Sequence, residues 1–204
     1  MPDAQPRIST TDQGYTERLL RQQDAWWKRV VDVRGIYGWN LRRLNPGFTL
    51  DVGCGLGRNL AHLRGAGVGV DHNAASVEVC RSRGFEAFTP DEFRQSKYAG
   101  PGRFHSLLLA HVVEHMTFEE AVGLIGEYLP SLDDTGQVIL VTPQEAGYKT
   151  DPTHVEFVDF SRLAALFDRL GLDLVRSLSF PLPHKPFGRL FRYNEFVVVG
   201  RRRP

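Results

Sequence analysis

The sequence predicts an α/β fold: a Rossmann-like, doubly wound sheet of seven mainly parallel strands, with an antiparallel C-terminal hairpin and an N-terminal helical lid. Three observations lead to this prediction. Short apolar segments alternate with segments of helical periodicity, a pattern typical of a parallel sheet covered on both faces. The first apolar segment ends in a glycine-rich turn, as strands do in nucleotide-binding sheets. The last two apolar segments have no helical pattern between them, so we expect them to pair antiparallel.

The size and composition of the chain indicate one globular domain. Its 204 residues are enough for a single core, and the shares of hydrophobic residues (42%) and charged residues (24%) are ordinary for a globular protein. We therefore expect one domain over residues 1–204. The formal net charge of +1 argues against nucleic acid as a partner, because such binding requires a strongly basic surface.

Two features of the sequence favour the cytoplasm. The two cysteines, Cys54 and Cys80, do not form a CxxC pair, which suits a reducing compartment better than a disulfide scaffold. The N-terminus has no positively charged start followed by an apolar stretch, so we expect no signal peptide. No segment approaches the roughly 20 apolar residues that a membrane-spanning helix needs, and we expect no membrane partner.

The lid is predicted over residues 12–44, where leucine, tryptophan, valine and isoleucine recur at roughly helical spacing. Asn45, Pro46 and Gly47 end this helical segment. The Rossmann-like core follows over residues 48–200. Its strands are expected where apolar segments stand between turn residues, at residues 48–52, 68–71, 86–88, 107–110, 137–141, 172–180 and 195–199.

Local capping patterns set the helices between these strands. Asn73 is a suitable N-cap, Thr117 and Glu120 match a capping box, and Gly171 is expected to end the last helix. Segment 181–194, between the last two strands, is rich in proline, aromatic and basic residues. It has two interpretations: a loop that closes over a substrate, or an exposed hairpin tip. The helices themselves are expected at residues 60–63, 73–83, 118–129 and 161–170.

The stretch LDVGCGLGRN, residues 50–59, combines three glycines with an acid. Gly53, Gly55 and Gly57 follow Asp51 at the end of the first strand and the start of a helix. Glycines let the backbone approach a ligand closely, and a helix N-terminus offers free N–H groups to an anionic part of that ligand. A nucleotide-type cofactor is therefore expected at this turn.

Two cofactors compete for the turn. A dinucleotide places its pyrophosphate there, but its GxGxxG fingerprint is incomplete because Arg58 replaces the third glycine, and Asp51 would repel a pyrophosphate. S-adenosylmethionine (SAM) carries an ammonium, a sulfonium and one carboxylate, so Asp51 attracts its ammonium. Asp71 ends the second strand, 20 residues after Asp51, where an acid binds the ribose hydroxyls of either cofactor. The charges favour SAM.

Four motifs resemble those of the class I SAM-dependent methyltransferases, in the family's order: LDVGCGLGRNL, GVGVDHN, LLLAHVVEHM and GQVILVTPQ. The resemblance covers roughly residues 48–142 and implies methyl transfer from SAM. It implies contacts with the methionine end, the ribose, the adenine and the methyl donor of SAM, in that order along the chain. The methionine end is expected to contact Asp51, Gly53, Gly55 and Gly57, and the ribose is expected to contact Asp71. The adenine is expected beside His72, Phe88 and Thr89, and the methyl donor beside Ala110 and His111.

Two more motifs, HVVEHM and KTDPTHVEF, bring His111, Glu114, His115 and His154 to the carboxyl rim of the sheet. In a first interpretation a histidine is the general base that deprotonates an acceptor hydroxyl, with His115 and His154 as the main candidates and His111 as a third. In a second, these four side chains bind magnesium, manganese or zinc, which lowers the pKa of the hydroxyl. In a third, the histidines only hold loops by hydrogen bonds.

The second interpretation has a parallel in a known metal site. HxxEH followed by a distant histidine resembles the site of the small-RNA 2'-O-methyltransferases, where a glutamate stands at the first position. His111 departs from that pattern, which puts magnesium in doubt because hard cations prefer oxygen ligands.

For the acceptor we predict a hydroxyl of a small molecule, with a saccharide as the first expectation. By resemblance, enzymes that N-methylate DNA or protein often have an Asn/Asp-Pro-Pro-aromatic motif after the fourth strand, and this chain has Ala110, His111 and Val112 there. The alternatives are a quinone, phenol or other secondary metabolite as acceptor, a non-catalytic SAM-binding regulator or scaffold, and a dehydrogenase.

Overall fold

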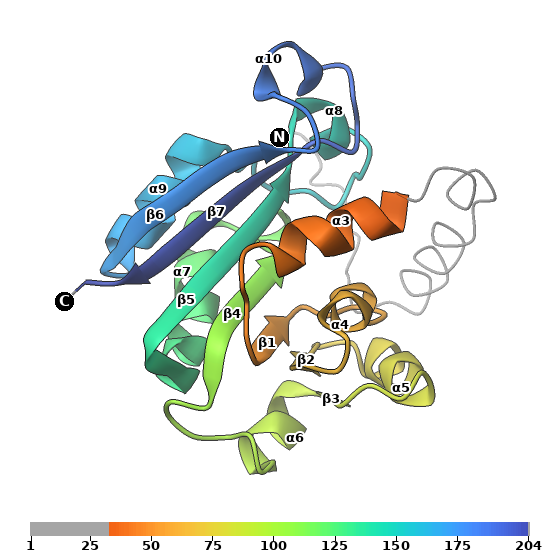
Figure 1. Ribbon diagram of the computed structural model, residues 1–204, viewed down its shortest axis with the longest axis vertical. Coiled ribbons are helices and arrows are strands. Elements are labelled where there is room, and N and C mark those ends of the chain that lie inside the picture. The colour runs from red at the N-terminus through yellow and green to blue at the C-terminus, as the bar shows by residue number, and fades with distance from the viewer. Residues whose placement is uncertain (1–32, 204) are drawn as a thin grey trace, which may run out of the picture.

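The computed structural model describes residues 33–203. Residues 12–32 of the predicted lid lie outside the described residues, and its last part is helix α3 (Val33–Arg42). This helix lies across one face of the sheet in Figure 1, beside α4 (Arg58–Leu63).

The predicted seven-stranded, mainly parallel sheet is confirmed. Its order is β3-β2-β1-β4-β5-β7-β6, in which β1 to β5 run parallel and β7 runs antiparallel to both β5 and β6. The predicted C-terminal hairpin is therefore also confirmed. The strands are β1 (Thr49–Val52), β2 (Gly67–Val70), β3 (Ala87–Phe88), β4 (Phe104–Ala110), β5 (Leu132–Pro143), β6 (Leu172–Phe180) and β7 (Glu195–Arg202).

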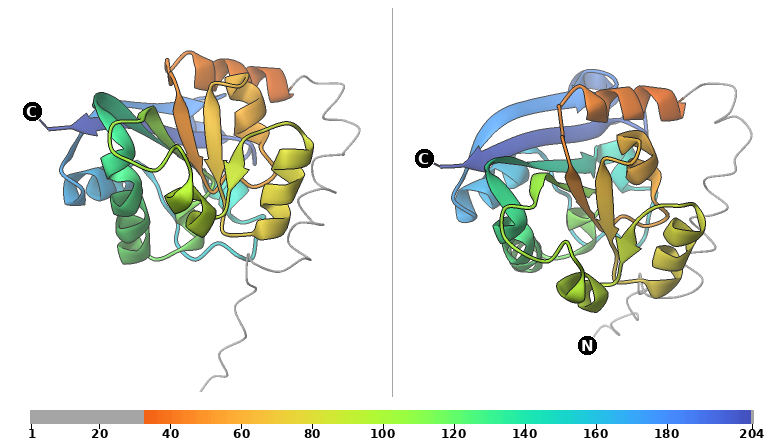
Figure 2. Two further views of the ribbon diagram at one scale, coloured as in Figure 1. Left: turned by 90° about the horizontal axis from the view of Figure 1, so that it is seen from below. Right: turned by 60° about the horizontal axis from the view of Figure 1, so that its bottom comes forward.

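Helices cover both faces of the sheet, as the doubly wound pattern requires (Figure 2). Along β4 the side chains alternate between two cores: Leu107 and Leu109 belong to one, and Leu108 belongs to the other. The first core includes residues of α7 (Phe118–Tyr128) and α9 (Phe160–Arg169), and the second includes residues of α3, α4 and α5 (Ala74–Ser82). Because both faces are buried, the central strands read as continuous apolar runs.

The predicted caps are present. The Asn73 side chain accepts from backbone N–H groups at the start of α5, the Thr117–Glu120 capping box begins α7, and Gly171 takes a left-handed conformation (φ 69°) after α9. Five short helical elements were not predicted, because segments of three to six residues carry little periodicity. They are α6 (Pro90–Gln95), α8 (Glu145–Tyr148), α10 (His184–Phe187) and the 3-10 turns η1 (Val113–His115) and η2 (Leu129–Ser131).

The strand order reverses between β1 and β4, since chain connections leave β1 in one direction across the sheet and β4 in the other. Ligands of doubly wound sheets bind at the carboxyl ends of the strands beside such a reversal. Because β7 is antiparallel, its first residue reaches this same edge, where Glu195 pairs with Pro143 at the end of β5. Within residues 33–203, no helix combines the length and apolar character needed to span a bilayer.

Candidate functional site at the carboxyl edge of the sheet

The glycine turn after β1 combines packing with open space. Gly53 and Gly55 both have left-handed backbones (φ 74° and 53°), which glycine adopts without strain. A Cβ atom on Gly53 would lie 2.4 Å from Cγ2 of Val112, whereas a Cβ on Gly55 would meet nothing within 4 Å. Gly53 is thus required by packing, and Gly55 leaves room for a ligand at the turn.

Asp51 lies in β1 beside this turn and is completely buried. Oδ1 accepts a long hydrogen bond from Nδ2 of Asn59 (3.4 Å), and Oδ2 has no hydrogen-bond partner among the described residues. Burial raises the pKa of Asp51 to about 7, although Asn59 and the charge of Arg58 oppose the shift. Burial of an unpartnered carboxylate oxygen is costly, and a cationic group beside it would stabilise its charged form.

Asp71 follows β2 and connects the two neighbouring loops. Its Oδ2 accepts from the backbone N–H of Gly55 (2.8 Å) and its Oδ1 accepts from that of Asn73 (2.9 Å). Each carboxylate oxygen has a second lone pair, so hydroxyl donors of a ligand still find acceptors there. His72 has a half-exposed side chain, with Nδ1 3.7 Å from Asp71 Oδ1.

The two residues expected near adenine have other contacts as well. The Phe88 ring is partly buried and packs against Tyr98, with ring centroids 6.0 Å apart. Thr89 is the N-cap of α6, where it forms a capping box with Glu92. The hydroxyl of Thr89 is therefore engaged by the helix, and this capping box is the local pattern that predicts α6.

A small cleft, partly open to solvent, lies between α3, α4 and the sheet. Asn59 lines it on the side of the glycine turn, and Ala110 and Glu195 line it on the side of β4 and β7. Because Asn59 also binds Asp51, the cleft connects the neighbourhood of the buried acid with the ends of β4 and β7. Tyr37 of α3 also lines this space.

His111, the residue after β4, is held between two carboxylates. Its Nε2 lies 2.8 Å from Oε1 of Glu195 and its Nδ1 lies 3.3 Å from Oε1 of Glu114. Burial lowers the pKa of His111, but the interactions with Glu114 and Glu195 outweigh burial and raise it to about 9. His111 is thus an imidazolium at neutral pH. It also has a left-handed backbone (φ 62°), a strained conformation that is often found at functional sites.

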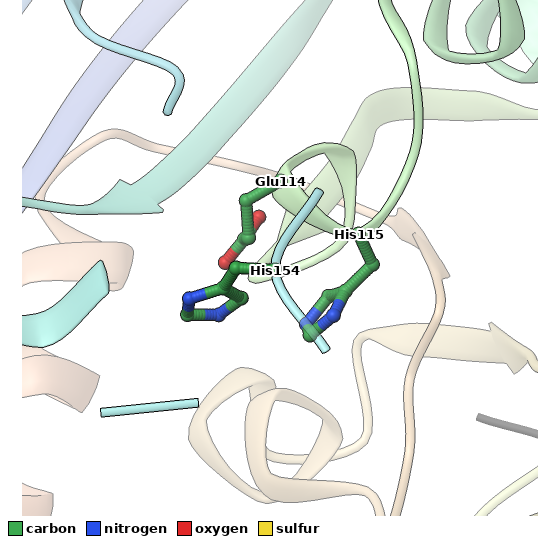
Figure 3. Close-up of side chains that lie close together, drawn as sticks. All are labelled: Glu114, His115 and His154. Atoms are coloured by element: carbon green, nitrogen blue, oxygen red, sulfur yellow. The ribbon is translucent and has the colours of Figure 1, made fainter. Parts of the chain in front are cut away.

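Glu114, His115 and His154 form a compact group, called here the EHH cluster (Figure 3). One potential ligand atom from each residue lies within 4.8 Å of the others. Glu114 is completely buried, and neither carboxylate oxygen has a hydrogen-bond partner among the described residues. His111 touches Glu114 but does not belong to this group.

Both histidines of the EHH cluster have one ring nitrogen engaged by the protein. Nδ1 of His154 lies 2.6 Å from the carbonyl oxygen of Tyr148, and Nδ1 of His115 lies 3.3 Å from that of Thr153. Burial lowers the pKa of His115, the charge of Glu114 raises it, and His154 lowers it further, with a net decrease. His115 is thus neutral at neutral pH, and each ring has Nε2 left for a proton or a metal ion.

Packing between two loops builds the EHH cluster. The carbonyl oxygen of Glu114 in η1 accepts from the backbone N–H groups of Val155 (2.8 Å) and Glu156 (3.3 Å). Tyr148, at the end of α8, stacks on His154 with ring centroids 5.0 Å apart. The short loop after β4 and the loop after α8 are therefore joined by backbone hydrogen bonds beside the cluster.

Segment 181–194 is anchored at the same edge of the sheet. His184 pairs with Glu145 of α8 (Nε2 to Oε1, 3.0 Å), and the hydroxyl of Tyr37 donates to the carbonyl oxygen of Tyr193. These contacts connect the segment with both α8 and α3. The role of this segment as a substrate loop stays a prediction.

Comparisons with known proteins identify the fold. No family model and no curated protein matches the sequence. A TehB-like SAM-dependent methyltransferase from Corynebacterium glutamicum has a TM-score of 0.67 at 14% identity, over 94% of this chain and 100% of that one. Magnesium protoporphyrin IX methyltransferase from Synechocystis, solved with bound SAH, has a TM-score of 0.63 at 17% sequence identity, and the match covers 95% of this chain and 96% of that one. Mitomycin 7-O-methyltransferase has a TM-score of 0.66 at 16% sequence identity, and the match covers 95% of this chain and 59% of that one.

The chain has the fold of the class I SAM-dependent methyltransferases. In this methyltransferase fold two groups of predicted residues lie at one edge of the sheet, and His111 lies beside the second group. The first surrounds the glycine turn, with Asp51 and Asp71, and the second is the EHH cluster. Glu195 and Thr153 were not predicted as site residues, although the direction of the last strand places Glu195 at this edge.

Proposed function

We propose that the protein is a SAM-dependent methyltransferase that transfers a methyl group to a hydroxyl of a small molecule. The observation that carries the proposal is the EHH cluster at the same sheet edge as the glycine turn. A fold of this kind hosts many functions, so the site and not the fold must support the chemistry. Here the site offers the neutral imidazole of His115 and, in Glu114, a buried carboxylate without hydrogen-bond donors in the described part of the chain.

The residues around the glycine turn fit SAM. Oδ2 of Asp51 has no hydrogen-bond donor within residues 33–203 and suits an ammonium group. Gly55 faces open space, and Asp71 offers acceptors for ribose hydroxyls. A pyrophosphate would meet the carboxylate of Asp51, so these charges favour SAM over a dinucleotide. When bound, SAM would supply an electrophilic methyl group on a sulfonium, which would pass to the acceptor oxygen with S-adenosylhomocysteine as the leaving group.

The EHH cluster supplies the proton acceptor. An aliphatic hydroxyl is a weak nucleophile until its proton leaves, and a histidine that is neutral at neutral pH takes such a proton. His115 and His154 fit this role because Nε2 of each ring is left unengaged by the hydrogen bonds at Nδ1. His111 does not fit it as well, because its carboxylate partners keep it protonated. We assign His111 the role of holding Glu114 in place.

A divalent ion in the EHH cluster is the second way to activate the hydroxyl. Two imidazoles and one carboxylate suit zinc or manganese better than magnesium, which prefers oxygen ligands. Glu114 favours this role, because it is completely buried and neither of its oxygens accepts a hydrogen bond within residues 33–203. Its ion-pair neighbour His111 is shared with Glu195, so a metal ion would give the Glu114 carboxylate a direct partner. An ion held there would lower the pKa of a hydroxyl bound to it.

The surroundings of the EHH cluster bear on the acceptor. A saccharide remains our first expectation. Val155 (40% exposed) and Phe157 (36% exposed) follow His154, and Phe157 packs edge-on against Tyr148. This apolar surface favours the second candidate, a phenol or quinone, because flat apolar rings pack on aromatic side chains.

For the location we propose the cytoplasm, since Cys54 and Cys80 are both free and buried.

Calorimetry on chelator-treated protein tests the proposal. SAM and S-adenosylhomocysteine are titrated first, then zinc or manganese, then a panel of sugars and phenols with methyl transfer followed by mass spectrometry. We expect SAM to bind without metal and at least one hydroxyl compound to be methylated. Absence of SAM binding would refute the cofactor assignment. SAM binding without methylation of any hydroxyl compound, with or without metal, would support the non-catalytic SAM-binding alternative.

The Asp71→Asn variant is expected to bind SAM about 1–3 kcal/mol more weakly, the usual effect of leaving buried polar groups imperfectly paired. Both oxygens of Asp71 accept from backbone N–H groups, of Gly55 and of Asn73. In the variant one of these oxygens is replaced by an amide NH₂ group, which is a donor and cannot accept from the N–H group that faces it. Calorimetric titration measures the change. The Asp91→Asn variant removes a carboxylate that is 89% exposed, and its affinity should equal that of the wild type.

Two alanine substitutions in the glycine turn are expected to differ in kind. Gly55→Ala should destabilise the protein by about 1–2 kcal/mol through its left-handed backbone, and should also weaken SAM binding because Cβ enters the open space. Gly53→Ala should destabilise it by about a further 1–3 kcal/mol, because Cβ overlaps Val112. Chemical denaturation and calorimetry separate the two effects. Undiminished SAM binding by Gly55→Ala would place the cofactor elsewhere.

A further inference from the structure

The turn at residues 151–154 does more than carry a histidine to the EHH cluster. Oδ1 of Asp151 accepts from the backbone N–H of Thr153 (2.9 Å) and from the Thr153 hydroxyl (2.7 Å). Oγ1 of the same threonine lies 3.0 Å from Nδ1 of His115. The three side chains thus form one hydrogen-bonded chain that ends at a ring of the cluster.

The chemistry of a hydroxyl group sets the direction of this chain. A threonine hydroxyl has one proton, and here that proton points to Asp151. Oγ1 of Thr153 is then only an acceptor toward His115, and the Thr153 carbonyl oxygen, 3.3 Å from the same nitrogen, is an acceptor by nature. Both contacts require the proton of the neutral imidazole to be on Nδ1.

Asp151 is suited to hold the hydroxyl in this direction. Burial raises the pKa of Asp151, but the hydrogen bonds from Thr153 outweigh burial, and the net pKa is lowered. Asp151 is therefore ionised at neutral pH and acts only as an acceptor. A protonated carboxyl in its place would be able to donate to Thr153 and reverse the chain.

We propose that Thr153 is a positioning residue that fixes His115 in the Nδ1–H tautomer, with Asp151 fixing the direction of the Thr153 hydroxyl. Nε2 of His115 then keeps its lone pair for the EHH cluster, whether the lone pair takes a proton from an acceptor or binds a metal ion. The importance of this lone pair rests on the proposed function. The tautomer itself is a property of the ligand-free protein.

The second histidine of the cluster provides an internal control. Nδ1 of His154 lies 2.6 Å from the carbonyl oxygen of Tyr148, so a backbone acceptor sets the tautomer of this ring. Removal of the Thr153 hydroxyl should therefore affect His115 and leave His154 unchanged. Positioning of a ligand histidine by a hydrogen bond at its other nitrogen is a general feature of metal and catalytic sites.

The test compares Thr153→Val, which keeps the shape of the side chain and removes the hydroxyl, with Thr153→Ser, which restores it. The tautomers are read from long-range ¹H–¹⁵N correlation spectra of the full-length, metal-free and SAM-free protein. We expect His115 to be the Nδ1–H tautomer in the wild type and in Thr153→Ser, and a mixture in Thr153→Val, where only the longer contact to the carbonyl oxygen remains. His154 should keep the Nδ1–H tautomer throughout.

Zinc binding gives the second readout. Calorimetry with zinc chloride should show an affinity about 10–100-fold lower for Thr153→Val, and near the wild-type value for Thr153→Ser. A wild-type His115 protonated on Nε2 would overturn the proposal. So would a Thr153→Val variant with an unchanged His115 tautomer, whatever its zinc affinity. None of these results depends on SAM binding or methyl transfer, so failure of the proposed function would be recognised separately.

Discussion

The Asp51→Asn variant is expected to bind SAM about 30- to 100-fold more weakly than the wild type, the usual contribution of a hydrogen bond between charged groups. At the same time its ligand-free form should be more stable above neutral pH. Both effects have one cause, because the buried Oδ2 of Asp51 lacks a hydrogen-bond donor within the described part of the chain. A charge that suits a cationic ligand destabilises the protein while that ligand is absent.

The pH dependence of the stability follows from the pKa of Asp51. Burial raises it from 3.8 to about 7 in the folded protein. The stability that the protonated form of Asp51 contributes is therefore fully present below pH 3.8, and it is lost as the pH rises through about 7. The Asp51→Asn variant does not lose this stability, so its free energy of unfolding should increasingly exceed that of the wild type as the pH rises from 3.8 to about 7. The difference should level off at about 1–3 kcal/mol, because the unpaired amide of the variant offsets part of the gain.

Thermal and chemical unfolding at several pH values, with calorimetric SAM titrations, measure both effects. In the wild type, the affinity for SAM should increase as the pH rises toward about 7, because the carboxylate form of Asp51 binds the ammonium. The Asp51→Asn variant should lack this increase. Asp91→Asn is the control for charge alone, since Asp91 is exposed. If Asp51→Asn and the wild type bound SAM with equal affinity, the assignment of Asp51 as the partner of the SAM ammonium would be contradicted.

The His154→Gln variant is expected to methylate its acceptor about 100-fold or more slowly than the wild type, the usual contribution of a general base. Its SAM affinity should be unchanged, because His154 belongs to the loop after α8 and the glycine turn follows β1. Single-turnover kinetics with saturating SAM measure the rate. His105→Gln is the matched control, because His105 is largely exposed near the start of β4, at the opposite edge of the sheet.

The Glu114→Gln variant separates the two ways of activating the hydroxyl. If an ion is required, zinc or manganese affinity and the methylation rate should fall together, and a chelator should silence the wild type. If a histidine acts alone, the chelator should have no effect on the wild-type rate. If the His115→Gln and His154→Gln variants were each as active as the wild type, both mechanisms would be contradicted and the EHH cluster would be a structural feature.

Much of the fold was predictable because its causes are local. The period of apolar residues distinguishes strands from helices, and the caps at Asn73 and Thr117 depend on side chains within three residues of the helix start. The glycine turn and Asp71 were predicted for the same reason, since each directly follows a strand. Helix α6 was not predicted although its capping box is equally local, because its six residues carry too little periodicity.

The sequence by itself determined the sheet, the glycine turn and the acids at the strand ends, because periodicity and turn chemistry act over a few neighbouring residues. Only the tertiary structure decided which histidines meet. Backbone hydrogen bonds from Val155 and Glu156 to Glu114 join two loops and build the EHH cluster. The antiparallel direction of β7 places Glu195 beside His111, which makes that histidine an imidazolium and separates it from the cluster. Such contacts join residues 38 to 84 positions apart, and no local pattern encodes them.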